Sequence, residues 1–382
     1  MLVVTNMLPG ARRSGGEIVT QSVVDALFAA GHDVRVLGYR APDDTAADAR
    51  GEACVGRRRI ETRAAGLSAA GWMLRAVATR APYTGAKWVS RDYRRAVAAG
   101  LAERPAALVV DHAGLLSVVP PAAALEVPMV FVGHNAEARM YEGLAAGSGS
   151  RPGRMVYRRE ARRIGAYEAE LARHARQVWA LTPADADYFR SLNPSADVRT
   201  LEVASVLPEP VAGPEPEYDV AIIGTWSWDA NAQGLRWFAD EVVPHLNGLR
   251  VEVAGRGAEW LDGRSPNVRV RGVVPDAADF MARARVVAVP SVEGGGVQLK
   301  TLDGIACGVP LVSTTVGTRG LDGLPGSVAV ADDPAEFARQ LERFAADPDR
   351  GRLRDEAVAW SRARRERLER DVADWVAEIA RP

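Results

Sequence analysis

The chain has 382 residues, of which 47% are hydrophobic and 25% are charged, and its formal net charge is −1 at pH 7. This length exceeds one ordinary core and suits two domains of about 150–200 residues each. The near-zero charge gives no support for a nucleic-acid partner. The sequence starts without a basic segment followed by a long apolar one, and no apolar run reaches the ~18 residues of a membrane span, so we expect a cytoplasmic protein.

Cysteine and lysine are both scarce. Cys54 and Cys307 fall in different predicted halves, and no cysteines or histidines have metal-ligand spacing, so we expect neither a disulfide nor a bound metal. All basic residues other than Lys87 and Lys300 are arginines. A lysine retained in such a chain points to a local chemical need.

The first half of the chain alternates apolar strands with helices. A strand over residues 2–5, a glycine-containing loop and a helix over 18–30 open the sequence, and further strands are predicted at 34–37, 107–110, 128–132 and 177–181. An arginine-rich helix is predicted over 154–176. Its arginines are typical of a solvated face, and they would also suit an anionic acceptor or a peripheral contact with a membrane.

Prolines at positions 208, 210, 214 and 216 mark a linker over residues 208–217, after which the alternation restarts. Strands are predicted at 220–223, 251–254, 268–270, 286–289, 310–313 and 328–331, and helices at 232–246, 276–285, 299–307, 334–346 and 355–380. We therefore predict an α/β chain of two Rossmann-like, doubly wound parallel-sheet domains, over 1–207 and 218–362, followed by a C-terminal helix over 363–382. This helix carries an apolar stripe that can pack on the second domain: Leu368, Val372, Trp375, Val376 and Ile379.

Two other nucleotide-binding classes lack their motifs. A dinucleotide site needs Gly-x-Gly-x-x-Gly after a strand and an acid at the end of the next strand. The second strand here ends at Tyr39-Arg40 without an acid, and Gly255-Arg256-Gly257 lacks a third glycine. The glycine–lysine loop of P-loop enzymes does not occur in the sequence.

The strongest motif is the glycine-rich segment 293–308, which follows an apolar strand. Gly294, Gly295 and Gly296 allow backbone N–H groups to approach a bulky anion. A helix predicted to begin near Val297 offers its N-terminus to the same anion. The segment therefore predicts a site for a diphosphate.

Lys300 lies in the first turn of this helix, where the helix dipole disfavours a cation, so we expect a negative ligand there. Asp303 follows three residues later on the same face and suits the hydroxyls of a ribose. The alternative is a glycine-rich turn with an intrahelical Lys–Asp pair.

These residues resemble the donor-binding signature of group-1 glycosyltransferases, the retaining family 4, and in particular a bacterial subgroup that reads Gly-Gly-Gly-x-x-Leu-Lys-x-x-Glu-Ala-x-Ala-x-Gly-x-Pro. Matching stretches occur in order at Gly15-Gly16, at Gly133-His134-Asn135, and at 224–231, 273–276 and 314–321. The resemblance implies the GT-B fold, in which two Rossmann-like domains face across a cleft and the terminal helix crosses back to the first domain.

The widespread family pattern has two glutamates eight residues apart, and this chain departs from it. Asp303 stands at the second position and Gly295 at the first, with Glu293 two residues earlier. The resemblance leaves Lys300 and Arg256 as cations for the phosphates, and it implies nucleotide contacts from Gly16, Val274, Val297 and the triple glycine. Further sugar or stacking contacts are expected from Glu293, Trp226 and Asn231, although Trp226 can equally pack in the core.

His134 ends an apolar strand and matches the family's histidine loop, so we expect it to hydrogen-bond the donor sugar or its phosphate. With Lys300, it is the predicted catalytic residue. Asp111 and His112 end another strand in the same half, where they can line the acceptor side or form a satisfied loop pair.

The motifs and the resemblance together predict a glycosyltransferase that moves a sugar from a nucleoside diphosphate-sugar, such as a UDP-sugar, to an acceptor hydroxyl. The resemblance implies that the configuration is retained. The acceptor can be a small molecule, a polysaccharide or a lipid, and we expect no cofactor and no metal. Two alternatives stay open: a nucleotide-sugar epimerase of the same fold, and a non-catalytic partner protein that binds a nucleotide sugar.

Overall fold

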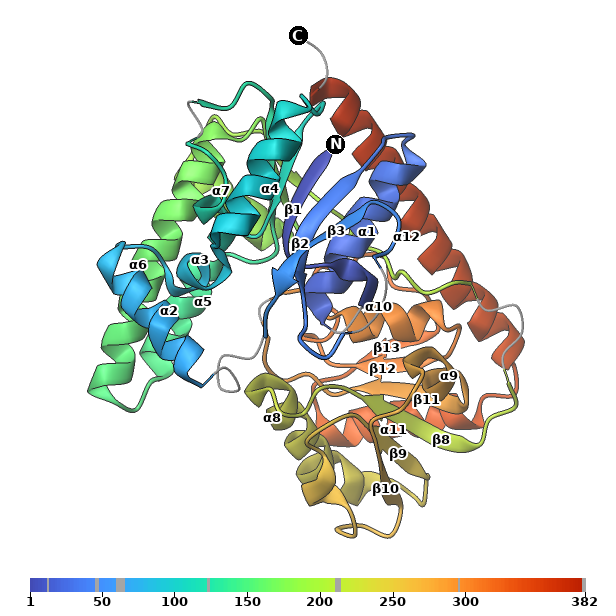
Figure 1. Cartoon of the computed structure of the whole chain (residues 1–382). Coiled ribbons are helices and arrows are strands. Elements are labelled where there is room, and N and C mark those ends of the chain that lie inside the picture. Colours follow the sequence, from blue (N-terminus) through green and yellow to red (C-terminus); the bar gives the residue numbers. More distant parts are fainter. Residues whose placement is uncertain are drawn as a thin grey trace. The chain divides into compact units, whose positions relative to one another are not determined.

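The computed structural model describes residues 1–11, 14–44, 48–59, 66–121, 124–209, 214–294 and 296–379. The chain divides into two compact units: Met1–Val203 with Arg367–Pro382, and Ala204–Glu366. Each unit contains one parallel sheet flanked by helices (Figure 1), which confirms the predicted α/β class. Of the linker predicted at 208–217, residues 210–213 lie outside the described residues.

The first unit holds a seven-stranded sheet in the order β3-β2-β1-β4-β5-β6-β7, in which all paired strands are parallel. The strands are β1 (Leu2–Met7), β2 (Arg35–Arg40), β3 (Glu52–Arg57), β4 (Leu108–Asp111), β5 (Met129–Gly133), β6 (Gln177–Ala180) and β7 (Val198–Thr200). The helices are α1 (Gly15–Ala29), α2 (Leu67–Ala78), α3 (Tyr83–Trp88), α4 (Arg91–Ala102), α5 (Glu137–Gly147), α6 (Arg151–His174) and α7 (Pro183–Leu192).

The second unit holds a six-stranded parallel sheet in the order β10-β9-β8-β11-β12-β13. Its strands are β8 (Tyr218–Ile223), β9 (Val251–Ala254), β10 (Val268–Gly272), β11 (Ala284–Val289), β12 (Leu311–Ser313) and β13 (Val328–Val330). Its helices are α8 (Asp229–Trp237), α9 (Ala277–Ala282), α10 (Leu299–Ala306) and α11 (Pro334–Ala346), and α12 (Arg350–Ile379) begins here.

Central strands appear where the sequence has continuous apolar runs. Every residue of β4 and of β5 is buried, because helices cover both faces of a parallel sheet. Short polar side chains fix the helix starts: the hydroxyl of Ser14 accepts the N–H of Glu17 in α1, and the hydroxyl of Thr182 accepts the N–H of Asp185 in α7.

Three elements differ from the sequence prediction. The edge strands β3 and β7 were not predicted, because they are only partly buried and lack a continuous apolar run. The single helix expected over 232–246 is α8 followed by a π-helical turn (Phe238–Val242) and a 3-10 turn (Val243–His245). Pro244 cannot donate a backbone hydrogen bond, which favours this interruption.

The last helix, α12, contributes residues to both units. Leu353 and Ala357 are buried in the second unit. In the first unit, the ring of Trp375 lies 5.5 Å from that of Trp179 in β6, and the side-chain amide of Gln177 donates to the carbonyl oxygen of Trp375 at 3.3 Å. The apolar stripe at the C-terminal end of α12 therefore packs on the first unit and not on the second. Within the described ranges, no helix is both long enough and apolar enough to pass through a bilayer.

Candidate active site

Each sheet reverses its strand order once, between β1 and β4 in the first unit and between β8 and β11 in the second. Open parallel sheets bind their ligands outside the carboxyl ends of the strands at such a switch point. The ends of these four strands, and the segments that follow them, carry Gly16, Asp111, Asn231 and Lys300. These four predicted residues therefore lie where ligands of this architecture bind.

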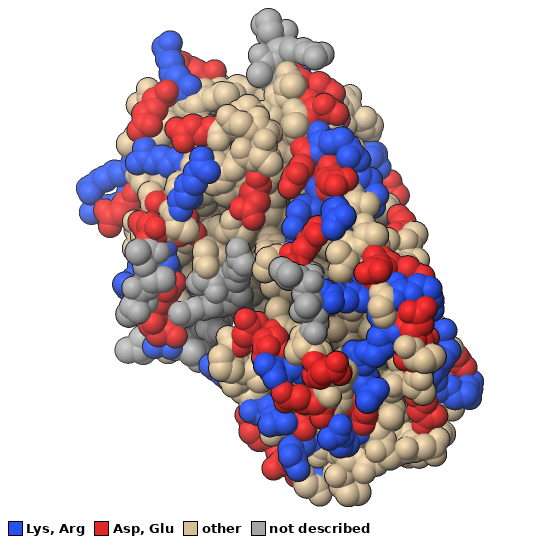
Figure 2. All heavy atoms as spheres, turned by 90° about the vertical axis from the view of Figure 1, so that its right-hand side faces the viewer, with Lys and Arg blue, Asp and Glu red and all other residues tan. Residues whose placement is uncertain are grey.

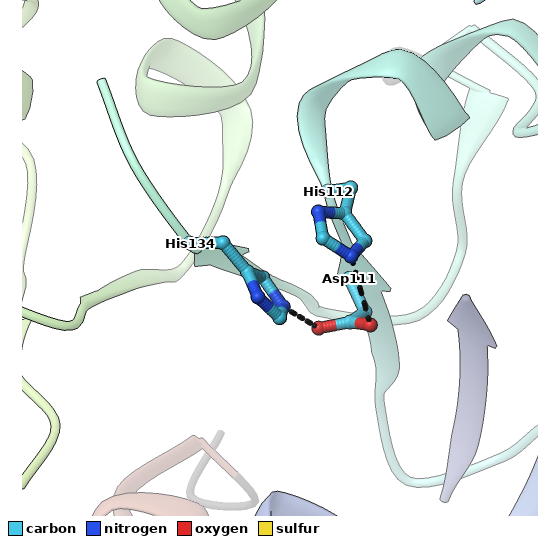
Figure 3. Close-up of side chains that lie close together, drawn as sticks. All are labelled: Asp111, His112 and His134. Carbon is cyan, nitrogen blue, oxygen red and sulfur yellow. Dashed lines mark hydrogen bonds and ion pairs between the residues drawn. The ribbon is translucent and has the colours of Figure 1, made fainter. Parts of the chain in front are cut away.

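Asp111 is the centre of a buried hydrogen-bonded cluster in the first unit (Figure 3). Its Oδ1 lies 2.5 Å from Nε2 of His134, which follows β5. Its Oδ2 accepts hydrogen bonds from the hydroxyls of Thr5 and Thr20, both at 2.7 Å. Burial alone would raise the pKa of Asp111, but the neighbouring imidazoles and these hydrogen bonds hold it well below its usual range. The ionised carboxylate thus fixes one ring nitrogen of His134.

His112 stacks on His134, with ring centroids 3.8 Å apart and planes inclined by 21°. Burial, and then the neighbouring His134, lower the pKa of His112 to about 3, so that its ring is neutral at pH 7. The backbone φ of His112 is +93°, a costly conformation for a residue other than glycine and one that is concentrated at functional sites. Gly16 lies against this ring, since a Cβ there would be 3.5 Å from Nε2 of His112. The structure therefore brings all four predicted first-unit residues together.

The backbone that carries His134 is held by carboxylates from later helices. Asp185 in α7 accepts the N–H of Ala136 at 2.9 Å. Glu168 in α6 accepts the N–H of Glu137 at 2.6 Å and the hydroxyl of Tyr188 at 2.6 Å. These bonds position the segment between β5 and α5, so the orientation of His134 depends on residues far along the chain.

Glu137 and Glu168 form a buried acid pair beside this segment. Burial raises the pKa of Glu137 to about 8 and that of Glu168 to about 7. The pair therefore retains a proton near pH 7. Glu137 also accepts the backbone N–H of Ala113, directly after His112, so it links the segments of both histidines.

Asp111, His112 and His134 also have the donor atoms of a metal site, and these atoms lie within 4.8 Å of one another. An ion such as Zn²⁺ needs about 2.0–2.2 Å to each nitrogen and oxygen, so it would have to replace the His134–Asp111 hydrogen bond. The other oxygen of Asp111 already accepts two hydroxyls. The cluster therefore fits an oriented histidine better than a metal centre.

Lys300 and Asn231 meet at the switch point of the second unit. Nζ of Lys300 donates to Oδ1 of Asn231 at 3.1 Å and lies 5.9 Å from the ring centroid of Trp226. Burial lowers the pKa of Lys300 to about 8, and among the residues that the structure describes no carboxylate pairs with its ammonium. A largely buried cation without a counter-charge favours an anionic ligand.

Glycines allow the loops around Lys300 to pack closely. A Cβ on Gly255 would lie 1.8 Å from the carbonyl oxygen of Gly224, and the φ of Gly255 is +111°. A Cβ on Gly234 would likewise lie 2.0 Å from the carbonyl oxygen of Pro290. These loops follow β9, β8 and β11, so only glycine permits the three strand ends to converge in this way.

The start of α10 lies beside this convergence. Its N-cap residue, Gln298, makes no side-chain capping hydrogen bond, which leaves the first turn open to an anion. Gly294 precedes it with a φ of +148°, Gly296 and Val297 are half-buried, and the predicted contact Gly295 lies outside the described residues.

Other predicted donor contacts have distinct surroundings. Asp303 in α10 accepts the hydroxyl of Ser205 at 2.7 Å. Arg256 is exposed, and its carbonyl oxygen accepts the backbone N–H of Trp226 at 2.9 Å. Trp226 itself is 3% exposed and donates its ring N–H to the carbonyl oxygen of Ala254 at 2.8 Å. It packs in the core, so the stacking face suggested for it is not presented to a ligand.

Two further predicted residues have surroundings of their own. Glu293 is exposed. Val274 lines a pocket with Tyr218 and Phe280, and neither Lys300 nor Asn231 lines that pocket.

Sequence reasoning missed the residues that hold these groups in place. Thr5 and Thr20 fix Asp111, Ser205 binds Asp303, and Glu168 supports the His134 segment. The one usable signal was a threonine at the end of a predicted strand, because Thr5 faces the switch point. The other supporting residues, Thr20, Ser205 and Glu168, come close to the groups they bind only when the chain is folded.

Comparisons with sequence families found matches in both halves of the chain. The family described as glycosyl transferases group 1 matches residues 217–347, and the glycosyl transferase 4-like domain matches residues 14–203. The chain belongs to the GT-B glycosyltransferases. A comparison of this glycosyltransferase with curated proteins found no match.

Solved structures share its fold at low identity. One is the Anabaena protein HepE in complex with UDP-glucose, with 13% identity, a TM-score of 0.63, and coverage of 99% of this chain and 100% of the other. Another is the sucrose-phosphate synthase of Thermosynechococcus elongatus, with 14% identity, a TM-score of 0.61, and coverage of 99% and 97%. A third is TarM, with 13% identity, a TM-score of 0.51, and coverage of 72% of this chain and 55% of TarM. An S. aureus form of TarM is also similar.

Proposed function

We propose that this glycosyltransferase binds a nucleoside diphosphate-sugar on its second unit and transfers the sugar to an acceptor hydroxyl with retention of configuration. Glycosyltransferase families match both halves of the chain. Retention rests on the resemblance to the retaining family 4. The acceptor side is assigned to the first unit, where Gly16, Asp111 and His112 surround His134.

The observation that carries the donor assignment is the ammonium of Lys300. It is largely buried, has the neutral Asn231 as a partner and no carboxylate partner among the described residues, and lies in the first turn of α10. Each of these features costs free energy in the absence of an anion. A diphosphate would supply the missing charge, and the ammonium would stabilise it further as it leaves the sugar.

The first-unit cluster supplies a second polar group for the sugar. The hydrogen bond that His134 donates to Asp111 fixes which nitrogen of His134 remains for a ligand. In the reaction, the bond between the anomeric carbon and the diphosphate oxygen breaks, a bond to the acceptor oxygen forms, and the acceptor proton passes to the departing diphosphate. His134 would hold the sugar or its phosphate during this exchange.

UDP-sugars are the first donors to test, because HepE, with the same fold, has been crystallised with UDP-glucose. Small molecules, polysaccharides and lipids remain candidate acceptors. We propose that transfer takes place in the cytoplasm and without a cofactor or metal, since the phosphate charge can be met by Lys300 and by the first turn of α10.

The decisive experiment is a thermal-shift screen against nucleotide sugars, followed by an assay of nucleoside diphosphate release with pooled acceptors. A true donor raises the unfolding temperature by mass action, by the equivalent of about 2.7 kcal/mol at a hundredfold excess over Kd. Acceptor-dependent release of diphosphate with a glycosylated product supports the proposal.

Other outcomes would contradict it. Binding without transfer to any acceptor would instead identify a non-catalytic partner protein. Interconversion of one nucleotide sugar into another, with no acceptor consumed, would identify an epimerase.

A further inference from the structure

The first unit exposes apolar side chains on three of its helices. The side chains concerned are exposed to between 39% and 73%: Leu74, Val77, Met140, Leu144, Met155 and Val156. Figure 1 shows their helices, α2, α5 and α6, grouped on one side of this unit. We call these six residues the apolar patch. Clusters of exposed large apolar side chains commonly mark interaction sites.

On α2, one exposed stripe is apolar, and the exposed Ser68 and Arg75 lie beside it. Leu74 and Val77 share it with Ala70, Gly71 and Ala78, which have the spacing of one helical stripe and are also exposed. This helix therefore turns an apolar stripe toward solvent, where a water-facing helix would carry polar residues.

The patch continues on α5 and α6, which pack against each other. The rings of Tyr141 in α5 and Tyr157 in α6 lie 6.5 Å apart. In the sequence, Met140 directly precedes Tyr141 and Val156 directly precedes Tyr157, and both belong to the patch. The guanidinium of Arg159 in α6 donates to the carbonyl oxygen of Ala76 in α2 at 2.7 Å. Ala76 lies between Leu74 and Val77, so this bond ties α2 to the same assembly.

The charge around the patch is predominantly positive. Arg151, Arg154, Arg158 and Arg162 are exposed on α6, and residues 143–159 contain no acid. Residues 62–91, which include α2, also contain arginine and lysine but no acid. Of the nearby glutamates, Glu160 is buried and Glu142 is exposed. The face shown in Figure 2, by contrast, mixes charges of both signs.

We propose that α2, α5 and the first half of α6 dock this glycosyltransferase on an anionic lipid bilayer. Apolar side chains entering the headgroup region, with arginines at the level of the lipid phosphates, are the combination that binds such surfaces. A second copy of the chain fits less well, because a symmetric contact would place the same arginines opposite one another. The proposal does not depend on the sugar donor or on the acceptor.

The test is co-sedimentation of the full chain with vesicles of phosphatidylcholine alone or mixed with phosphatidylglycerol. We expect binding to the mixed vesicles only. Raising the salt from about 0.1 M to about 1 M shortens the Debye length from about 10 Å to about 3 Å and should release most of the protein. Equal partitioning onto both kinds of vesicle would overturn the proposal.

Two variants separate docking from general surface effects. The double variant Leu74→Glu/Met155→Glu and the double variant Arg154→Glu/Arg158→Glu should each lower the partition coefficient by about tenfold or more. Val273→Glu is the matched control, because Val273 is 69% exposed but lies in the second unit. Circular dichroism and thermal unfolding verify that each variant is folded.

Further outcomes would also count against the lipid surface. Wild-type binding by both double variants, or an equal loss in Val273→Glu, would refute it. Reversible dimerisation that Leu74→Glu/Met155→Glu abolishes, without any vesicle binding by the wild type, would replace the bilayer with a second copy of the chain.

Discussion

Nε2 of His134 lies 2.5 Å from Oδ1 of Asp111, and the second oxygen of that carboxylate accepts the hydroxyls of Thr5 and Thr20. The carboxylate thus has partners on both oxygens and is not free to rotate away from the imidazole. Its negative charge selects the tautomer of His134.

Replacing Asp111 by Asn keeps the shape of the side chain and removes its charge. We expect kcat to fall by about 10²–10³-fold, the range for the loss of one oriented polar contact to the reacting groups, with a small change in the unfolding temperature. Initial rates of diphosphate release measure this. Asp187→Asn, which alters an exposed surface pair with Arg190, should leave kcat unchanged. An unaltered kcat in Asp111→Asn would remove the cluster from the catalytic machinery.

The acid pair makes the fold sensitive to alkali. Burial raises the pKa of Glu137 to about 8, whereas the unfolded chain releases this proton near the ordinary pKa of a glutamate, 4.5. Between these values the folded state binds more protons, so stability falls as the pH rises, with a slope of at most about 1.4 kcal/mol per pH unit for one proton. Glu137→Gln should therefore gain unfolding temperature over the wild type at pH 8 and little at pH 5.

The control for this effect is Glu142→Gln, which changes an exposed glutamate on the same helix. Its unfolding temperature should follow the wild type at every pH. A difference between Glu137→Gln and the wild type that does not grow from pH 5 to pH 8 would show that the buried pair does not hold a proton.

Lys300 should give donor binding its own pH dependence. Burial lowers its pKa to about 8, so the ammonium is present below that pH and is lost above it. We expect kcat/KM for the donor to fall as the pH rises beyond 8 in the wild type. In Lys300→Arg this fall should vanish, because a guanidinium stays charged.

Removing the charge of Lys300 altogether measures how much this ammonium contributes to kcat/KM for the donor. Lys300→Met should lower kcat/KM for the donor by about 10²–10³-fold, in the range of one lost electrostatic contact to a developing charge. Arg269→Met, at an exposed position in β10, is the control for the loss of one positive charge. Equal kcat/KM in Lys300→Met and in the wild type would contradict the role given to Lys300.

Alanine substitutions at two glycines distinguish the cost of a strained backbone from the cost of a steric clash. Gly255 and Gly263 both have positive φ, at +111° and +75°, but a Cβ meets the carbonyl oxygen of Gly224 only at Gly255. Gly263→Ala should cost about 1 kcal/mol of unfolding free energy, and Gly255→Ala about 3 kcal/mol or more. Denaturant unfolding of both variants measures the difference. Equal costs would mean that the loops after β8 and β9 can separate without penalty.

Much of the fold was predictable because buried parallel strands are written as uninterrupted apolar runs. β9 and α11 occur with the bounds expected for them, and β4 and β5 are shifted by one residue. β3 and β7 were not predicted because an edge strand is only partly buried and can contain charged residues, which interrupt the apolar pattern. β3 contains Arg57 and β7 contains Arg199. The apolar stripe of α12 does not specify its partner, and only the family resemblance implied the contact with the first unit that the structure has.

The site could be predicted to the level of its loops. Lys300 was identifiable because lysine is rare here and is unfavourable in a first turn, and Asp111 and His134 because they end apolar strands. Their partners are set by tertiary structure: Ser205 and Asp303 are 98 positions apart, and Thr5 and Asp111 are 106 apart. Trp226 shows that position in a loop does not specify the direction of a side chain. An aromatic residue in a strand-end loop can turn into the core as readily as toward a ligand.

The scarcity of lysine makes selective chemical labelling of this glycosyltransferase at Lys300 feasible. Amine-directed acylation has two side chains to modify, and Lys87 is 5% exposed with its ammonium over the ring of Trp88. Lys300, with a pKa of about 8, offers a neutral nucleophile under mildly alkaline labelling conditions. A fluorophore or affinity tag attached through a lysine would mark this one position, and protection from labelling by a candidate nucleotide would report its occupancy directly.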